Sequence, residues 1–244
     1  MLPQIDISRI AEDLDRLSDE IQDAYEDGYR DKDTEPRTLA NALRETLHAL
    51  ERCQDAPSGS DDPLRSKHIN SLTDHGLDLL GQLAALADRL HLPDQAREVE
   101  ALALPFACCA ARCNAEIASP ALVVNAAAAL ANELKRPEQL EALYGLMSEI
   151  VDAVSPRITA ELGSSDPDRP WRVLLLNRAI VATRSHQTRL MEEAFDAVAD
   201  QLPEDAPQFF REAMEQMEAL DYPEQLRAVV VRYYENWRSR RTLH

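Results

Sequence analysis

Apolar side chains recur at intervals of three and four residues over most of the chain, and this spacing predicts amphipathic helices. The first stripe comprises Ile7, Ile10, Leu14, Leu17, Ile21 and Ala24. A second, within a helix predicted over 37–53, comprises Leu39, Leu43, Leu47 and Leu50. The other faces of the first helix are acidic, which is typical of a helix with one buried and one solvated side. A docking arm or a dimer seam is the alternative reading of that helix.

A short phrase beginning with proline recurs where later helices are expected to start. It reads Pro-Asp-Gln-Ala at 93–96 and Pro-Glu-Gln-Leu at 137–140 and 223–226. Proline is tolerated at the first position of a helix because the N–H that it lacks would have no partner there. Each phrase closely follows another helical run, so we predict a tight turn and a second helix that returns antiparallel.

Breaker residues divide the chain into pairs of helices. Loops rich in Pro, Gly, Ser and Asp are predicted at 56–63 and 163–170. The first loop separates an acidic N-terminal hairpin over 1–55 from a helical-repeat domain over 64–240, with hairpins at about 64–117, 120–154, 171–202 and 207–240, and the second loop lies within that domain. Pro105 is expected to kink or end its helix. The predicted fold is all-α, about ten to eleven helices in stacked antiparallel hairpins.

The C-terminal half resembles a degenerate tetratricopeptide repeat. Ala219–Leu226 is similar to the turn between the two helices of that repeat, and Trp171–Gln208 has a similar length, with Ala179 and Phe195 near positions that are usually small and aromatic. The pattern departs from the family at Met191, where a small residue is usual, and in lacking the expected glycine. The resemblance implies an α-solenoid whose concave face binds another chain.

The same resemblance implies which polar residues line that face. First helices of such repeats line the groove, and asparagine side chains there hold a peptide backbone. The groove candidates are Asn125, Asn177, Arg178 and Arg184. The alternative is that each buried asparagine bonds a neighbouring carbonyl and serves only the fold.

Composition narrows the partners of this 244-residue chain. Its formal charge of −18 at pH 7 disfavours nucleic acid, since phosphate binding depends on Lys and Arg. No apolar run reaches the ~20 residues of a membrane-spanning helix. Richness in Arg, Ala and Leu is typical of a bacterial protein from a GC-rich genome. We expect a soluble protein, cytoplasmic or, if a signal peptide was removed, periplasmic. Its oligomeric state is left open.

The sequence contains no motif that predicts catalysis. It has no glycine-rich phosphate loop, no His-Glu-x-x-His and no nucleophile elbow, so we expect neither an enzyme nor a resident cofactor or metal. Cys53, Cys108, Cys109 and Cys113 lack the Cys-x2-Cys spacing of zinc sites. Buried free thiols are the favoured reading. A disulfide from Cys53 to Cys109 or Cys113 is the alternative, and it would indicate an oxidising compartment.

Two uncharged stretches, Ala101–Ala111 and Ile117–Asn132, are rich in small and apolar residues. Tight helix packing explains them most simply. They could instead wall an apolar cavity, with candidates Phe106, Leu122, Val123, Leu146 and Met147. The predicted function is therefore a non-enzymatic protein- or peptide-binding, scaffolding module. The alternative is a carrier that holds a lipid or sterol-like molecule between hairpins and takes part in lipid transport.

Overall fold

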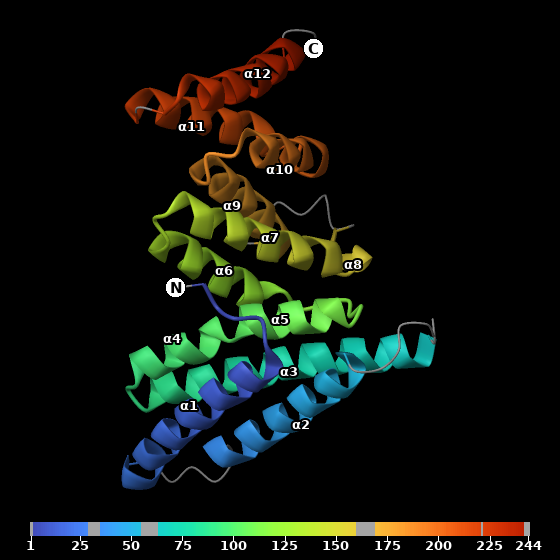
Figure 1. Ribbon diagram of the computed structural model, residues 1–244, viewed down its shortest axis with the longest axis vertical. Helices are drawn as coiled ribbons and strands as arrows, with labels where there is room; N and C mark the ends of the chain where they lie inside the picture. The colour runs from blue at the N-terminus through green and yellow to red at the C-terminus, as the bar shows by residue number, and fades with distance from the viewer. Residues whose placement is uncertain (1, 29–34, 55–62, 160–168, 221, 242–244) are drawn as a thin grey trace. The chain divides into compact units, whose positions relative to one another are not determined.

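The computed structural model describes residues 2–28, 35–54, 63–159, 169–220 and 222–241, and these residues are predominantly helical (Figure 1). They contain twelve helical segments, of which α8 (Pro156–Thr159) is a single turn. The eleven longer helices confirm the predicted all-α fold. The only extended pairing in the described ranges is an isolated bridge between Ile117 and Val154. Apart from Pro63, Arg169 and Pro170, the two predicted loops lie outside those ranges.

The chain forms two compact units, which are described separately. The N-terminal unit comprises the described residues of 2–130 and 149–158, and the C-terminal unit comprises those of 131–148 and 159–244. The division falls within α6 (Ala121–Glu133) and α7 (Pro137–Ala153), so each of these helices contributes residues to both units.

The N-terminal unit contains a closed four-helix bundle. Its helices are α1 (Ile7–Gly28), α2 (Pro36–Gln54), α3 (Pro63–Arg89) and a fourth, divided into α4 (Pro93–Ala101) and α5 (Ala103–Arg112). Each packs on the next, and α1 also packs against α4 and α5, which closes the ring. The helices of the expected hairpin over 1–55 therefore share this unit with those that follow.

The apolar stripe of α1 faces the core of this bundle. Ile7, Ile10, Leu14, Leu17 and Ile21 are all buried, and Ala24 is half-buried. This confirms the helix that the spacing predicts. It also shows why α1 packs on more than one neighbour, since a stripe this wide cannot be covered by α2 alone.

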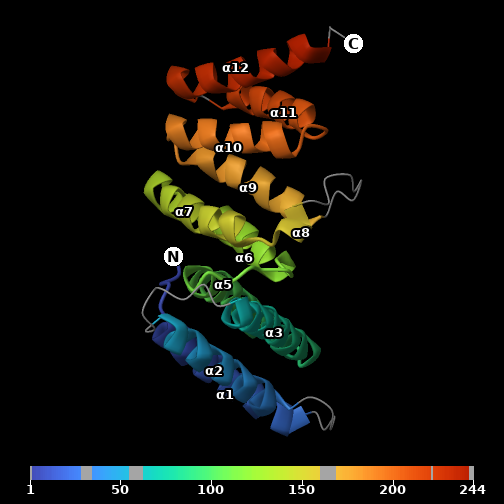
Figure 2. The same cartoon turned by 90° about the vertical axis from the view of Figure 1, so that its right-hand side faces the viewer.

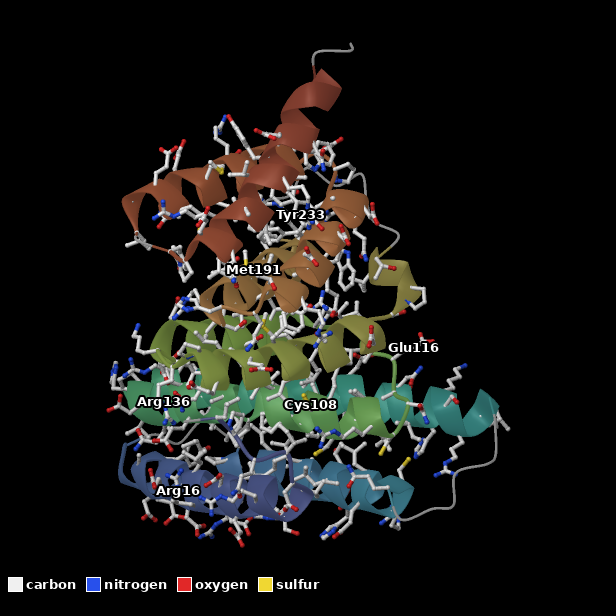
Figure 3. The ribbon with its side chains drawn as sticks, turned by 45° about the horizontal axis from the view of Figure 1, so that its top comes forward. Arg16, Cys108, Glu116, Arg136, Met191 and Tyr233 are labelled. Carbon is white, nitrogen blue, oxygen red and sulfur yellow. The ribbon has the colours of Figure 1, made fainter. Side chains whose placement is uncertain are left out.

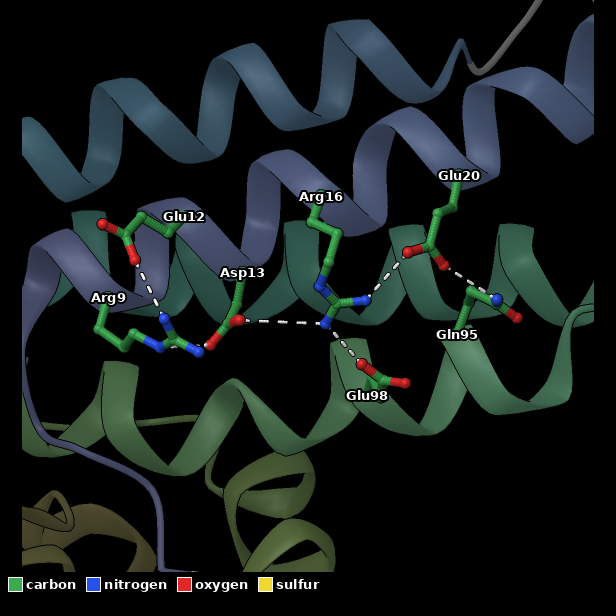
Figure 4. Close-up of polar contacts among 7 residues, drawn as sticks. All are labelled: Arg9, Glu12, Asp13, Arg16, Glu20, Gln95 and Glu98. Atoms are coloured by element: carbon green, nitrogen blue, oxygen red, sulfur yellow. Dashed lines mark hydrogen bonds and ion pairs between the residues drawn. The ribbon is translucent and has the colours of Figure 1, made fainter.

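An ion pair and a hydrogen bond join the polar side of α1 to α4 (Figure 4). Arg16 Nη2 lies 2.6 Å from a carboxylate oxygen of Glu98, and Gln95 Nε2 donates to Glu20 Oε2 at 3.0 Å. The hydrogen bonds from Gln95 and Arg16 lower the pKa of the Glu20 carboxyl. Because these side chains are largely exposed, they fix the register of the two helices more than they stabilise the unit.

Pro105 divides the fourth helix of the bundle, as expected. A proline within a helix removes one hydrogen bond and crowds the carbonyl four residues earlier, here that of Ala101. α4 ends at Ala101, and α5 begins two residues later. The next side chain, Phe106, then enters the core: a Cβ placed on Gly76 of α3 would lie 2.3 Å from its ring. The glycine thus makes room for an aromatic ring that is 1% exposed.

The connection between α5 and α6 is anchored on α3 and on the end of α7. Asn70 Oδ1 accepts from the Glu116 amide at 2.9 Å, and Asp74 Oδ1 accepts from the Ala118 amide at 3.0 Å. On its other side, the Ile117 amide donates to the Ala153 carbonyl at 2.8 Å. These bonds satisfy backbone groups that no helix pairs, so the connection is held without a sheet. Figure 3 labels Glu116 in this segment.

The C-terminal unit contains two successive antiparallel pairs, α9 (Pro170–Arg184) with α10 (Thr188–Gln201), and α11 (Ala206–Ala219) with α12 (Glu224–Arg241) (Figure 2). The second helices, α10 and α12, also pack on each other. This is the arrangement that stacked hairpins require, and it matches the predicted pairs at 171–202 and 207–240.

The prolines occupy the helix starts that the recurring phrase predicts. Pro93 and Pro137 are the first residues of α4 and α7. Pro223 immediately precedes α12, and its carbonyl accepts from the Leu226 amide at 3.0 Å. None of the helices in the described ranges combines the length and apolar composition needed to cross a membrane.

Candidate partner-binding groove

A groove of about 550 Å³ runs between α9 and α11 in the C-terminal unit. Its walls come from the first helices of the two pairs and from the residues that follow α11. The lining residues are Ile180, Thr183, Arg184, Phe209, Glu212, Ala213, Glu215, Gln216, Met217, Leu220 and Tyr222.

The wall formed by α11 is one continuous helix face. Phe209, Ala213 and Met217 follow one another at intervals of four residues, which places them on the same side, and Leu220 continues this side just beyond the end of the helix. This face extends for about three turns, or roughly 16 Å. On α9, the lining residues Thr183 and Arg184 lie three and four residues after Ile180, so all three are on one side of that helix. The groove is therefore a space between two helix faces.

Exposed apolar side chains distinguish this groove. In the described residues, three large apolar side chains are exposed: Leu64, Ile180 and Leu220. The last two line the groove. Ile180 is 44% exposed and Leu220 is 50% exposed. A single exposed leucine is ordinary on a protein surface, but two exposed apolar side chains that face one hollow make it the candidate binding surface of this unit.

The α11 wall of the groove is backed by a cluster of aromatic side chains. Phe209 contacts the ring of Phe195 edge-on at 5.7 Å and that of Phe210 at 5.3 Å. Phe210 stacks on Tyr233 of α12, whose hydroxyl donates to Asp196 Oδ1 at 2.5 Å. The cluster ties α10, α11 and α12 together, so the α11 wall is held in place from behind. Figure 3 labels Tyr233.

Two carboxylates and one guanidinium line the groove, so the net charge of its lining is negative. Glu212 and Glu215 are exposed on α11, and Glu212 accepts from Gln208 Nε2 at 2.8 Å. The cation that lines the groove, Arg184, is already engaged. Its guanidinium donates to the carbonyl of Ala131 at 2.6 Å and to that of Leu134 at 2.7 Å, at the C-terminal end of α6.

One end of the groove is formed by Leu220 and Tyr222, which lie between α11 and α12. Tyr222 meets the ring of His186 edge-on at 5.6 Å, and its carbonyl accepts from Arg227 Nε at 2.9 Å. These contacts hold the Tyr222 side chain at the groove while Leu220 stays exposed beside it.

Of the polar candidates from the sequence, Arg184 lines the groove and the other three do not. Asn125 is exposed on α6, within the N-terminal unit, and Asn177 is half-buried on α9. The side chain of Arg178 is 6% exposed, so it is not available to a peptide. On α9, Arg178 and Ile180 are two residues apart and therefore point to different sides of the helix.

Arg178 connects three helices inside the C-terminal unit. Its guanidinium lies 4.4 Å from the ring centre of Tyr144 on α7, and Nε donates to Ser148 Oγ at 2.9 Å. Nη2 pairs with Glu193 Oε1 of α10 at 2.5 Å. Burial raises the pKa of the Tyr144 hydroxyl. The charge of Arg178 thus stabilises the packing of α7, α9 and α10.

The apolar candidates are divided between the two units. Phe106 and Val123 are buried in the N-terminal unit, whereas Leu146 and Met147 belong to the C-terminal unit. Leu122 and Leu146 are half-buried. At Phe106 the interior is filled, since the ring leaves no room for a methyl group on Gly76. The carrier hypothesis stays a prediction.

The four cysteines are free thiols in the N-terminal unit, three of them buried. Cys113 Sγ donates to the Leu50 carbonyl at 3.6 Å, and it also contacts the Cys53 side chain. Burial raises the pKa of Cys109 to about 11 and that of Cys108 to about 12. In the described residues, no three His, Cys, Asp or Glu side chains are grouped to hold a metal ion.

The raised thiol pKa values make the N-terminal unit sensitive to alkali. A thiol pKa raised from 9.0 in the unfolded chain to about 11 or 12 contributes stability that is complete below pH 9 and is lost as the pH rises through the folded values. We expect the denaturant midpoint to fall between about pH 9 and 10, before the buried tyrosines contribute. A Cys108→Ala, Cys109→Ala, Cys113→Ala variant should show a flatter pH dependence; an equally steep slope in this variant would contradict the assignment.

The fold and the groove define an all-α protein whose helices pack in antiparallel pairs, with one apolar, acidic hollow between the first helices of two pairs. Compared with known proteins, the chain matches no family model, no curated protein and no solved structure. The geometry of the groove therefore carries the functional conclusion.

Proposed function

We propose that this protein is a non-enzymatic helical-repeat module that binds another protein or peptide, and that the groove between α9 and α11 is its binding surface. The observation that carries the proposal is the pair of exposed apolar side chains, Ile180 and Leu220, on the two walls of one groove. Covering them removes apolar surface from water and supplies the driving force for association.

The architecture supports this use of the groove. In helical-repeat proteins, adjacent first helices commonly present a continuous surface to a partner while the second helices form the back of the stack. Here the second helices, α10 and α12, pack on each other, and Phe195 of α10 contacts the ring of Tyr233 of α12 edge-on. The first helices, α9 and α11, are then left to line the groove.

The proposal is tested by selecting binders from a displayed library of random peptides on the full-length protein. We expect clones whose affinity falls by about tenfold or more on Ile180→Asp and on Leu220→Asp, because a carboxylate buried against the bound peptide is costly. Affinity is measured by fluorescence anisotropy with a labelled synthetic peptide.

Leu64→Asp provides the matched control, since Leu64 is also an exposed leucine, 78% exposed, but lies on α3 in the other unit. It should leave the affinity unchanged, and circular dichroism should show equal helicity in all variants. Failure to select any clone that discriminates Ile180→Asp from Leu64→Asp would refute the binding surface.

A further inference from the structure

We infer that the occupant of the groove is an amphipathic α-helix of about three turns whose apolar stripe is flanked by lysine or arginine side chains. The inference rests on the proposed function and goes beyond it, because it specifies the conformation and the charge of the partner segment.

The length of the occupant follows from the α11 wall. The lining residues run from Phe209 to Leu220 along one face of the helix, a distance of roughly 16 Å. A partner helix that lies along this wall contacts it over about three turns. Its contacting residues are apolar and occupy positions i, i+3, i+4, i+7 and i+11.

The conformation of the occupant follows from what the groove lacks. An extended peptide needs partners for its own backbone N–H and C=O groups, either from a free strand edge or from clamping side chains. The walls here are helices whose backbone bonds are internal. Asn125 and Asn177, the candidate clamps, do not line the groove. Thr183 Oγ1 donates to the Ala179 carbonyl and the Arg184 guanidinium to two carbonyls. One amide side chain, Gln216, also lines the groove, too few partners for the backbone of an extended segment. A helix satisfies its own backbone and brings only side chains to the walls.

The charge of the occupant follows from the carboxylates beside the apolar stripe. Glu212 and Glu215 both line the groove, and Glu218, the next acid on α11, is exposed as well. The chain as a whole carries a formal charge of −18 at pH 7. A partner helix with acidic flanks would be repelled, whereas basic flanks complement these groups and accelerate encounter.

A patterned peptide library separates these features. Each member of the first pool has apolar residues at i, i+3, i+4, i+7 and i+11 and an equal mixture of lysine and glutamate elsewhere. A second pool has the same pattern except for a central proline, which breaks a helix. Both are displayed and selected on the full-length protein, with clones that still bind Ile180→Asp discarded. We expect enrichment from the first pool only, with lysine in excess of glutamate.

The matched protein variant is Glu212→Lys, Glu215→Lys, which reverses the charge of the wall without changing its apolar residues. On this variant the excess should shift from lysine to glutamate. A purified lysine-rich clone should bind the variant about tenfold more weakly than it binds the wild-type protein. Added salt should also weaken its binding to the wild-type protein. The preference for basic flanks is due to Glu212 and Glu215 only if it reverses when the charge of these two residues is reversed.

The outcomes distinguish this inference from the proposed function. Equal recovery of lysine and glutamate, or equal recovery of the proline-containing pool, overturns the basic helix while groove-dependent random peptides still support a binding surface. Loss of groove-dependent binding in every library overturns both.

Discussion

Replacing Phe195 by alanine is expected to lower the free energy of unfolding of the C-terminal unit by about 3–5 kcal/mol. Phe195 is fully buried on α10, and its ring makes edge contacts with Phe209, Phe210 and Tyr233 at 5.7, 5.3 and 5.2 Å. Truncation removes the burial of the ring, leaves a cavity, and loosens three neighbours from α11 and α12.

The measurement is denaturant unfolding followed by tryptophan fluorescence. Both tryptophans of the chain, Trp171 and Trp237, belong to the C-terminal unit, so the signal reports on this unit. Phe195→Leu is the matched control and should cost less than about 1.5 kcal/mol, because it keeps most of the apolar volume. A loss for Phe195→Ala no larger than for Phe195→Leu would show that the cluster is not the centre of this core.

The same substitution links stability to the groove. Phe209 both lines the groove and rests on Phe195, so removing the ring behind it takes away support for the α11 wall. Because the α11 wall and the core share residues, the groove depends on the core and not on a mobile loop. A binding surface built on packed helices loses less entropy when a partner docks.

Much of the fold could be predicted from local patterns. The spacing of Ile7, Ile10, Leu14, Leu17 and Ile21 describes a helix with one buried side whatever lies against it, and these residues are buried. Proline likewise acts through its own backbone. Pro93 and Pro137 begin helices because the missing N–H is harmless at a helix start. Pro105 divides a helix because an interior position needs that N–H for a hydrogen bond.

The closure of the N-terminal bundle could not be predicted in this way. Apolar spacing shows that α1 has a buried side but not which helices cover it, and α4 and α5 are about 65 to 100 residues further along the chain. Turn geometry was also hidden. His91, Asn114 and His186 adopt positive φ angles of 61°, 59° and 61° after helix ends, a place where glycine is the usual signal.

The candidate site was only partly visible in the sequence, because the fate of an apolar residue depends on distant neighbours. Of the residues that the sequence suggests, Arg184 lines the groove. Ile180 and Leu220, in contrast, look like ordinary core residues in the sequence and are exposed in the structure. Arg178 shows the converse: a charged residue within an apolar helix suggested a groove, yet it is buried because Glu193, Ser148 and Tyr144 surround it. Charge alone does not reveal whether a partner comes from the same chain.

Because Arg178 is buried, its replacement is expected to cause the second large loss of stability. Arg178→Ala should destabilise the C-terminal unit by about 3 kcal/mol, the lower end of what breaking a buried ion pair costs, because the side chain of Glu193 is 48% exposed and can be rehydrated. Arg189→Ala is the matched control. Arg189 pairs with the same carboxylate at 3.6 Å, but its side chain is 80% exposed, so its loss should cost less than about 0.5 kcal/mol.

Tryptophan fluorescence during denaturant unfolding measures both variants, and a double-mutant cycle with Glu193→Ala isolates the ion pair from the contacts of Arg178 with Tyr144 and Ser148. A coupling energy well below the total loss would assign most of the effect to those two contacts. Equal losses for Arg178→Ala and Arg189→Ala would contradict the structural role, since the two arginines share a carboxylate and differ mainly in burial. Retained peptide binding by Arg178→Ala at temperatures where it stays folded would confirm that this arginine supports α9 from behind and is no part of the groove.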